Sequence, residues 1–468
     1  MKMKFILPAL TEAESPLRRP IKYSLFPPLG LATLAAYLDS SEEAEIVDQH
    51  IEELSLDDYP DIVAIEVYIT NAKRAYKIAD HYRCKGIFVI LGGLHVTSLP
   101  DEASKHADAI FLGSAEESFP RFLKNYRRRA PQERYFSSQR SLIGIPPIRR
   151  DLIKRGLYLV PNSIVVTRGC PHHCEFCYKD AFFKNGRKSF YTQSVDDAIS
   201  EIGRLPGRHL YFLDDHLLGH RRFATDLFRE MQSIGRIFQG AATVDSILRG
   251  DLIEKAADAG LRSIFIGFES LNPDNLKQTN KKQNINRDYD RVINRLHELG
   301  IMINGSFVFG LDSDDSEVFK RTVDWAVKTG ITTATFHIAT LYPGTAFYHK
   351  MQSEQRLLTN DWDRYDTRQV VFQPVGMTAA ELKDGYDSAY RDFYSWSAIA
   401  RSSLFHGSLK HQLKHFFYTG GWKKFEPLWN MIIQIKKLNQ TTPLLEAVLS
   451  KASRLEDGPQ TKPLGKGG

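Results

Sequence analysis

The sequence predicts an α/β protein with an N-terminal doubly wound, Rossmann-like domain, a partial (β/α)6 barrel of the TIM type, and a C-terminal helical region. Three observations support this prediction. Short β-branched, apolar runs alternate with helical segments through most of the chain, as in parallel sheets covered by helices. Pro146 and Pro147 divide this alternation into two parts. Beyond Met377 the strand pattern stops and only helical spacing continues.

The first domain is predicted over residues 1–145. Its expected strands cover residues 4–7, 45–47, 61–69, 87–91 and 109–112, and its expected helices cover 29–38, 71–83 and 119–128. Ligands of such sheets bind beyond the carboxyl ends of the strands. Gly92, Gly93 and Gly113 lie at two of these ends, where glycine lets a large ligand approach the backbone. On the glycines alone, tight turns are the simpler interpretation.

The second domain is predicted over residues 150–376. Its expected strands cover residues 163–166, 209–213, 241–244, 263–268, 305–309 and 333–338, with helices over 195–204, 223–234, 251–259, 289–299 and 316–328. Six such units are too many for a second small Rossmann unit and indicate an open barrel. Active sites of barrels form at the carboxyl ends of the strands.

A helical domain is predicted over residues 377–455, starting at a capping box of Thr378 and Glu381. Residues 456–468, rich in Gly, Pro and Lys, are predicted to be a disordered tail. Residues 401–440 contain seven Lys or Arg and one acid, so this stretch carries the whole net charge of +6 and the rest of the chain is neutral. A basic nucleic-acid-binding body is therefore not indicated.

Composition places the chain among folded proteins, with 42% hydrophobic and 25% charged residues. No apolar run approaches the ~18 residues of a membrane span. No signal peptide is visible, so we expect a cytoplasmic protein. The aromatic residues among the basic ones of 401–440 allow two interpretations. They either pack helices onto the barrel or contact an anionic membrane peripherally, at the inner membrane.

Three of the four cysteines lie within eight residues, at Cys170, Cys174 and Cys177, directly after the first barrel strand. Three thiolates on one loop can ligate three irons of a cubane cluster and leave the fourth iron open. Phe176 would then pack beside the ligand of the open iron. The alternative is a zinc site completed by His172 or His173. Structural zinc sites usually pair two ligand hairpins, and the sequence has no second one, so a cluster is favoured.

The run Arg168-Gly-Cys170-x3-Cys174-x-Phe-Cys177 resembles the signature of the radical S-adenosylmethionine (SAM) superfamily. The chain is similar to the class of that superfamily with an N-terminal cobalamin-binding domain. This class includes hopanoid and phosphinate C-methylases and the anaerobic bacteriochlorophyll cyclase. The similarity covers about residues 20–400 and includes the segments 91–97, 106–116, 267–270, 305–310, 341–345, 361–366 and 372–377.

The resemblance implies that Cys170, Cys174 and Cys177 hold a [4Fe–4S] cluster, whose open iron the amino and carboxylate groups of SAM chelate. It also implies SAM contacts at the ends of the barrel strands. Asp214 and Asp215 end the second strand, where relatives often carry a Gly-Gly-Glu run against the methionyl amine; helix capping is the alternative for each acid. The remaining expected contacts are Phe176, Glu269 on the fourth strand and Gly310 on the fifth.

For cobalamin, the resemblance implies contacts in the first domain from Gly92, Gly93, His95, Gly113 and Glu116. A structural role in its loop is the alternative for His95. Asp48-Gln-His50 superficially resembles the Asp-x-His-x-x-Gly motif that supplies a lower ligand to cobalt. Glu53 stands where that motif requires Gly, so we consider this match coincidental. Members of the class without the motif bind cobalamin with no protein lower ligand.

The implied activity is reductive cleavage of SAM to a 5′-deoxyadenosyl radical, followed by cobalamin-dependent methylation of an unactivated carbon. Ring formation or rearrangement, as in the cyclase, is the alternative within the class. A non-enzymatic zinc-binding module is a remote alternative. Methylthiolation needs three further N-terminal cysteines, and only Cys84 remains. The expected partners are a small-molecule substrate, which can be lipid-like, and an electron donor such as flavodoxin or ferredoxin.

Overall fold

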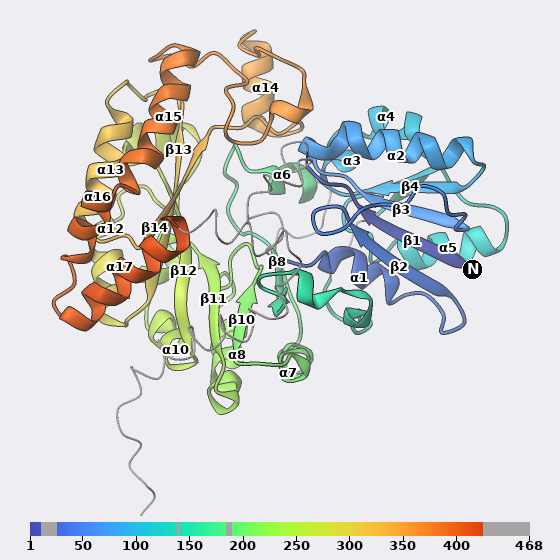
Figure 1. Ribbon diagram of the computed structural model, residues 1–468, viewed down its shortest axis with the longest axis horizontal. Coiled ribbons are helices and arrows are strands. Elements are labelled where there is room, and N and C mark those ends of the chain that lie inside the picture. Colours follow the sequence, from blue (N-terminus) through green and yellow to red (C-terminus); the bar gives the residue numbers. More distant parts are fainter. Residues whose placement is uncertain (11–25, 138–140, 184–189, 425–468) are drawn as a thin grey trace, which may run out of the picture.

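The computed structural model describes residues 1–10, 26–137, 141–183 and 190–424. It contains two parallel six-stranded sheets that lie apart, with the segment around α6 (Tyr178–Phe183) between them (Figure 1). Helices cover both faces of the N-terminal sheet and the outer face of the second sheet, and helices from the C-terminal part of the chain cover part of that outer face (Figure 1). The predicted fold class is confirmed.

The N-terminal sheet has the strand order β2-β1-β3-β4-β5-β6. Alternate side chains of each strand point to opposite faces. Phe5 therefore lies in a core with α1 (Leu29–Ala35) and α5 (Phe119–Arg127), and Ile6 lies in a core with α2 (Ala72–Cys84). The strands are β1 (Lys2–Leu7), β2 (Glu43–Asp48), β3 (Ile62–Glu66), β4 (Phe88–Gly92), β5 (Ala109–Leu112) and β6 (Arg134–Phe136). The sequence did not predict the edge strand β6, which has only three residues.

The second sheet has the strand order β14-β13-β12-β11-β10-β7, with all neighbours parallel. The six expected β-α units are present. Its strands are β7 (Ser163–Ile164), β10 (His209–Phe212), β11 (Ile237–Ala242), β12 (Leu261–Glu269), β13 (Met302–Phe309) and β14 (Thr333–Ile338). Its outer helices are α7 (Val195–Arg204), α8 (Arg221–Ile234), α10 (Leu252–Asp258), α12 (Tyr289–Glu298) and α13 (Val318–Lys328).

Three predicted strands were placed wrongly. The strand expected over 61–69 ends at Glu66, and Ile69 already begins a short 3-10 helix. The strand expected over 241–244 begins at Ile237, and Val244 already starts helix α9 (Val244–Leu248), because the apolar run crosses the boundary between strand and helix. The strand expected over 163–166 ends at Ile164. The chain turns there and continues as β8 (Thr167–Gly169), which pairs antiparallel with β9 (Phe190–Thr192).

The helical region begins at the predicted capping box. The hydroxyl of Thr378 accepts a hydrogen bond from the Glu381 amide at 3.1 Å, and the Glu381 carboxylate accepts one from the Thr378 amide at 2.7 Å. Helices α15 (Ala379–Phe393), α16 (Trp396–Ser403) and α17 (Leu409–Lys424) follow. The rest of the predicted helical domain and the predicted tail lie outside the described residues. No helix within the described ranges has both the length and the hydropathy that crossing a membrane requires.

Polar contacts join the N-terminal sheet and its helices to the barrel. Lys73 on α2 pairs with Asp361 at 2.6 Å. The Trp362 indole donates to Glu102 at 3.1 Å, and the Tyr158 hydroxyl donates to Asp48 at 3.0 Å. Further ion pairs across this boundary join Arg168 to Glu116 and Lys154 to Glu52.

Candidate active site

The three clustered cysteines lie on the loop between β8 and α6, on the side of the barrel that faces the N-terminal sheet. The Cys174 side chain is buried, and Cys170 and Cys177 are partly buried. Burial raises the pKa of the Cys177 thiol to about 11, while the nearby Lys179 ammonium acts in the opposite direction. Iron ligation deprotonates a thiol outright, so this burial is compatible with three thiolate ligands.

A second segment, Thr279–Asn284, holds the cysteine loop in place. The Glu175 amide donates to the Thr279 carbonyl at 3.0 Å, and the Asn280 side chain donates to the His173 carbonyl at 2.6 Å. The Gln283 amide nitrogen donates to the Cys174 sulfur at 3.3 Å. We call Thr279–Asn284 the anchor segment. It comes about a hundred residues after the cysteines, and no spacing rule connects the two.

Glu269 lies in this environment, but it is already paired. It ends β12 in a left-handed conformation, with φ of 63°, beside an irregularity in the pairing with β13. Its carboxylate contacts the Lys281 ammonium at 2.6 Å, and both side chains are about nine-tenths buried. The Cys174 and Cys177 charges help to raise the pKa of Lys281. The Lys281 ammonium also lies 5.9 Å from the Phe176 ring. Lys281 therefore connects Glu269 to Phe176 within the cysteine loop.

Asp214 and Asp215 both contact the chain around the cysteine loop. The buried Asp214 carboxylate accepts hydrogen bonds from the Val166 amide at 3.1 Å and from the Thr167 amide, where the chain turns from β7 into β8. Burial raises the Asp214 pKa to about 7. Asp215 forms an ion pair with Lys179 on α6. Contact of either acid with SAM remains a prediction.

Gly310 lies after β13 with φ of 90°, and its amide donates to Asp314 at 3.0 Å. A Cβ atom there would lie 2.7 Å from a methyl carbon of Leu382 on α15. The open side of this glycine is thus filled by hydrophobic side chains of the protein. Its predicted contact with adenine would have to use the backbone alone.

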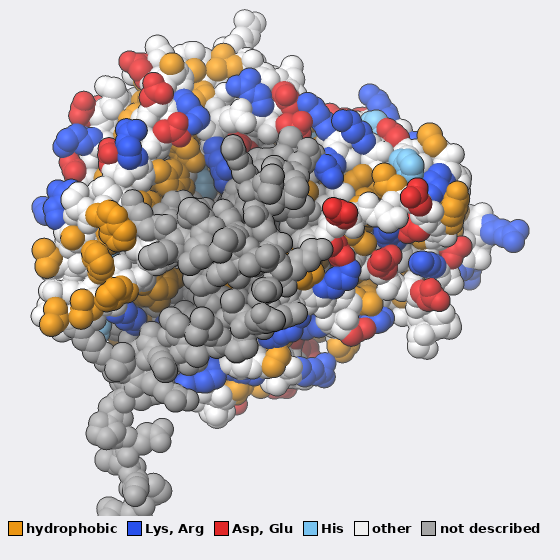
Figure 2. Space-filling view, in the orientation of Figure 1, with side chains coloured by type: hydrophobic (Ala, Val, Ile, Leu, Met, Phe, Trp, Pro, Cys, Tyr) orange, Lys and Arg blue, Asp and Glu red, His pale blue; other side chains and the backbone are white. Residues whose placement is uncertain are grey.

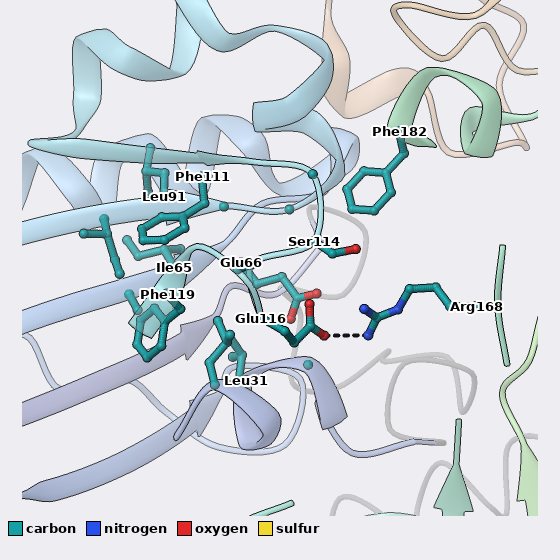
Figure 3. A pocket seen from close by; sticks show the side chains of 18 residues that line it. Leu31, Ile65, Glu66, Leu91, Phe111, Ser114, Glu116, Phe119, Arg168 and Phe182 are labelled. Atoms are coloured by element: carbon teal, nitrogen blue, oxygen red, sulfur yellow. Dashed lines mark hydrogen bonds and ion pairs between the residues drawn. The ribbon is translucent and has the colours of Figure 1, made fainter. Parts of the chain in front are cut away.

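The N-terminal sheet has a pocket of about 210 Å3 at the carboxyl ends of β3, β4 and β5 (Figure 3). Four of the five residues predicted to contact cobalamin line it: Gly92, Gly93, Gly113 and Glu116. Hydrophobic side chains form much of its wall: Leu31, Leu34, Ile65, Leu91, Phe111, Phe119 and Phe182. A Cβ on Gly92 would lie 3.5 Å from the Phe111 Cβ. The absence of a side chain at Gly92 therefore leaves space in the pocket beside Phe111.

The fifth residue, His95, does not line this pocket. Its side chain is fully buried, and its Nε2 lies 2.9 Å from the Glu102 carboxylate. The ring lies edge-on to Trp362, with the centroids 5.7 Å apart. This geometry supports the structural role for His95, at the boundary between the N-terminal domain and the barrel.

Two charged pocket residues, Glu66 and Arg168, were not predicted. Glu66 ends β3, and its carboxylate accepts a hydrogen bond from the Tyr68 hydroxyl at 2.9 Å. Burial raises the Glu66 pKa, and the Glu116 charge adds to the effect. Arg168 reaches the pocket from the barrel. Glu66 gave a signal in the sequence, because an acid ends an otherwise apolar strand at its ligand-binding end.

His50 is not available as a ligand from this conformation. Its Nδ1 lies 2.7 Å from the Asp48 carboxylate, and its Nε2 accepts a hydrogen bond from the Leu10 amide at 3.2 Å. The Leu10 bond makes Nε2 the acceptor, so the proton sits on Nδ1 toward Asp48. This agrees with the interpretation of Asp48-Gln-His50 as a coincidental match.

A second cavity, of about 360 Å3, lies between the two sheets. Tyr178, which follows Cys177 in sequence, contributes to its barrel wall. The described lining contains no Lys or Arg and is rich in aromatic side chains. Its residues are Leu7, Leu10, Phe26, Asp48, His50, Tyr68, Ile69, Thr70, Leu94, Tyr178, Tyr342, Tyr365, Asp366 and Thr367.

The cysteine loop suits a cluster better than a single ion. Among the described residues, no three His, Cys, Asp or Glu side chains are arranged to hold one metal ion. Three thiolates on one loop, one of them accepting an N–H···S bond, form a donor set for an iron–sulfur cluster.

Two family models match the chain. Residues 164–326 match the Radical SAM superfamily, and residues 23–123 match the B12 binding domain. The first range contains the cysteine loop and the anchor segment, and the second contains most of the lining of the pocket in the N-terminal sheet. A radical SAM domain works with a [4Fe–4S] cluster and SAM, and a B12 binding domain works with cobalamin. A non-enzymatic zinc-binding module is therefore ruled out.

Known proteins resemble the chain along most of its length. It is 29% identical to the bacteriochlorophyllide d C-12(1)-methyltransferase of Chlorobaculum tepidum, over 80% of this chain and 84% of that protein. It is 24% identical to the anaerobic magnesium-protoporphyrin IX monomethyl ester cyclase of Rubrivivax gelatinosus, over 86% of this chain and 81% of that protein. The fold matches that of the radical SAM methyltransferase TsrM from Kitasatospora setae, solved with cobalamin and a [4Fe–4S] cluster. That match has a TM-score of 0.63 at 13% identity and covers 94% of this chain and 99% of TsrM.

Proposed function

This chain belongs to the radical SAM enzymes that carry a B12-binding domain, and we propose that it methylates an unactivated carbon of a small, largely apolar molecule bound between its two sheets. When bound, the cluster supplies the electron that cleaves SAM to a carbon radical, and cobalamin supplies the methyl group. Both family matches and the methyltransferase relatives support this function.

One structural observation carries the proposal. The cavity between the sheets is walled by Tyr178, next to Cys177, on one side and by Tyr68, two residues after Glu66, on the other. Glu66 itself lines the pocket in the N-terminal sheet. A molecule in the cavity would therefore lie between the cysteine loop and the pocket that the B12-binding residues line. A substrate that fills this position would help to keep water away from a reactive radical.

The lining also limits the substrate. Five aromatic side chains and no described cation face the cavity, so a phosphate or a polycarboxylate would find no counter-charge there. Tyrosine hydroxyls and Thr367 offer hydrogen bonds to a carbonyl or hydroxyl group. We propose a flat or alicyclic apolar substrate that carries few such groups. A flavodoxin or ferredoxin is the proposed electron donor.

The decisive experiment uses full-length protein reconstituted anaerobically with iron, sulfide and hydroxocobalamin. It is incubated with a cell extract, a reductant and SAM deuterated in its methyl group, and the product masses are measured. A product that gains the labelled methyl group supports methyl transfer. SAM cleavage with an unlabelled, ring-closed or rearranged product would instead favour the cyclase alternative. No SAM cleavage by protein with full iron content would contradict both.

We further propose that the surface of α16 and α17 contacts an anionic membrane. Hydrophobic side chains gather on this surface, at the lower left of Figure 2. Leu404, Leu409 and Phe417 are each about two-thirds exposed, and Leu413 is 47% exposed. The buried side of α17 is instead polar: the Thr419 hydroxyl donates to the Thr332 carbonyl at 2.7 Å. Residues 396–424 contain five Lys or Arg and no acid. The part of the basic stretch beyond residue 424 lies outside the described residues.

Co-sedimentation with phosphatidylglycerol vesicles tests this surface. We expect binding that weakens in high salt and falls in the Leu413→Ser/Phe417→Ser variant, because apolar anchoring and charge act together. Val375→Ser, which changes an exposed side chain before α15, is the matched control. Equal binding to neutral vesicles, or no binding in low salt, would refute a membrane role. Since Thr332 immediately precedes β14, away from the carboxyl ends of the strands, such contact would anchor the enzyme and not feed the cavity directly.

A further inference from the structure

Arg168 connects the two parts of the proposed active site. It is the middle residue of β8 and stands two positions before Cys170. Its guanidinium reaches the pocket of the N-terminal domain, where it pairs with Glu116 at 2.5 Å (Figure 3). Of the described residues that line this pocket, Arg168 is the only Lys or Arg. The pocket's positive charge thus comes from the cysteine-loop side of the molecule.

The guanidinium has unused hydrogen-bonding capacity. Its Nη2 donates to Glu116, but Nη1 is buried and has no acceptor within the part of the chain that the structure describes. A buried N–H without an acceptor is costly, and a bound molecule that brings one would remove this cost. The position of the Arg168 side chain is fixed at both ends. Glu116 accepts a hydrogen bond from Nη2, and the pairing of β8 with β9 holds the Arg168 backbone.

The pocket's shape and charge define what it can hold. Phe111, Phe119 and Leu31 form a hydrophobic part of its wall that can accept a flat two-ring group. Glu66 and Glu116 make the remaining rim acidic. An anion at this rim would therefore be accepted only beside Arg168. Cobalamin carries such a pair of groups, since its nucleotide tail joins a benzimidazole base to a phosphodiester.

We propose that Arg168 binds the phosphodiester of the cobalamin nucleotide tail through Nη1, while Glu116 holds the guanidinium in place. This inference rests on the proposed function, because it assumes that cobalamin binds. The contact would tie the cobalamin tail to the strand that leads into the cluster ligands. Binding of the cofactor would then fix β8 against the N-terminal domain.

The test measures equilibrium binding of hydroxocobalamin and of cobinamide, which lacks the nucleotide tail, by absorption spectroscopy on the full chain. We expect Arg168→Met to weaken cobalamin binding roughly 10- to 100-fold, the effect of losing a charge-assisted hydrogen bond. Binding of cobinamide should change less than about twofold, within the range of a minor packing change. Arg168→Lys should retain part of the affinity, because it keeps the charge but loses the planar fork.

Two further variants separate contact from indirect effects. Arg168→Met/Glu116→Gln removes the carboxylate that the single change leaves unpaired; if the phosphodiester contact is direct, this double variant still binds cobalamin weakly. Arg150→Met is the matched control. Arg150 pairs with Glu201 at 2.5 Å with similar burial, but it does not line this pocket. Iron content after reconstitution should match the wild type in every variant, since none changes a cluster ligand.

The outcomes are distinct. If the wild type binds no cobalamin, the proposed function itself fails. If the wild type and Arg168→Met bind cobalamin equally well, the Arg168 contact alone is wrong. Equal losses of cobalamin and cobinamide, or recovery of cobalamin binding in the double variant, would also overturn it, because Arg168 would then only support the shape or charge balance of the pocket.

Discussion

Replacing Gln283 by Leu should make the cluster harder to reduce. The Gln283 side chain is 4% exposed, and its amide nitrogen donates to the Cys174 sulfur at 3.3 Å. Hydrogen bonds to cluster sulfurs raise the reduction potential because they stabilise the more negative, reduced state. Leucine has a similar size but offers no donor, so this variant removes the N–H···S bond and leaves the packing largely intact.

The size of the shift can be worked from this single bond. A hydrogen bond to a charged group contributes about 1.5–3 kcal/mol. Only the part that differs between the oxidised and reduced cluster alters the potential. If about half differs, the shift is roughly 30–60 mV to more negative values, because ~59 mV corresponds to a tenfold change in a one-electron equilibrium. The fold should tolerate the change, because the buried Gln283 carbonyl oxygen has no partner among the described residues that the substitution would leave unpaired.

The assay is a spectroelectrochemical titration of reconstituted protein without SAM, with the reduced cluster followed by electron paramagnetic resonance. Gln239→Leu is the control. Its side chain lies 2.9 Å from His209, on a barrel strand away from the cysteine loop, and its loss should leave the potential unchanged. An unchanged or raised potential in Gln283→Leu, at full iron content, would refute the role of this hydrogen bond.

Three further predictions follow from the site. Alanine at Cys170, Cys174 or Cys177 should abolish cluster assembly and SAM cleavage, whereas Cys84→Ala, at an exposed end of α2, should leave iron content normal; normal iron in any of the first three would contradict the ligand assignment. Gly92→Leu should reduce cobalamin retention on gel filtration by filling the pocket beside Phe111, with iron content as the control for folding; unchanged retention would place the cofactor elsewhere. Lys281→Met should lower the stability of the barrel by about 3–5 kcal/mol, because it leaves Glu269 buried without its partner. Thermal denaturation should show recovery in Lys281→Met/Glu269→Gln, and additive losses would argue against coupling of the pair.

The sequence allowed the prediction of features that depend on local pattern. Alternation of strands and helices gave both sheets. Cys170 was expected directly after the first barrel strand, but the short strand β8 lies between β7 and the cysteine loop. Gly92 and Gly113 lie at the carboxyl ends of their strands because a doubly wound sheet puts such turns there. Cys84, the one cysteine outside the cluster, ends α2 and is exposed.

Features that depend on long-range contacts were missed. The anchor segment reaches the cysteines only through the folded barrel, so Lys281 and Gln283 gave no signal in the sequence. Arg168 was visible within the cysteine signature. Its pairing with Glu116 joins two domains, and no periodic pattern in the sequence indicates such a contact. His95 and Gly310 were expected at ligands because of their neighbours in sequence. In the structure the His95 side chain contacts Glu102, and Leu382 occupies the space beside Gly310.

The boundary between the N-terminal domain and the barrel has a consequence for how the enzyme is loaded. The ion pair of Lys73 with Asp361 is exposed, with each side chain more than 40% exposed. The Tyr158–Asp48 hydrogen bond is buried, and the buried His95 ring packs edge-on to Trp362. Exposed ion pairs each contribute only ~0–1 kcal/mol and are screened by salt. The exposed ion pairs therefore add little to the stability of the boundary, whereas the buried contacts of Tyr158, His95 and Ile69 oppose its opening. We expect higher ionic strength to weaken only the exposed pairs, so that an opening that admits substrate or cofactor begins at the edge where Lys73 meets Asp361.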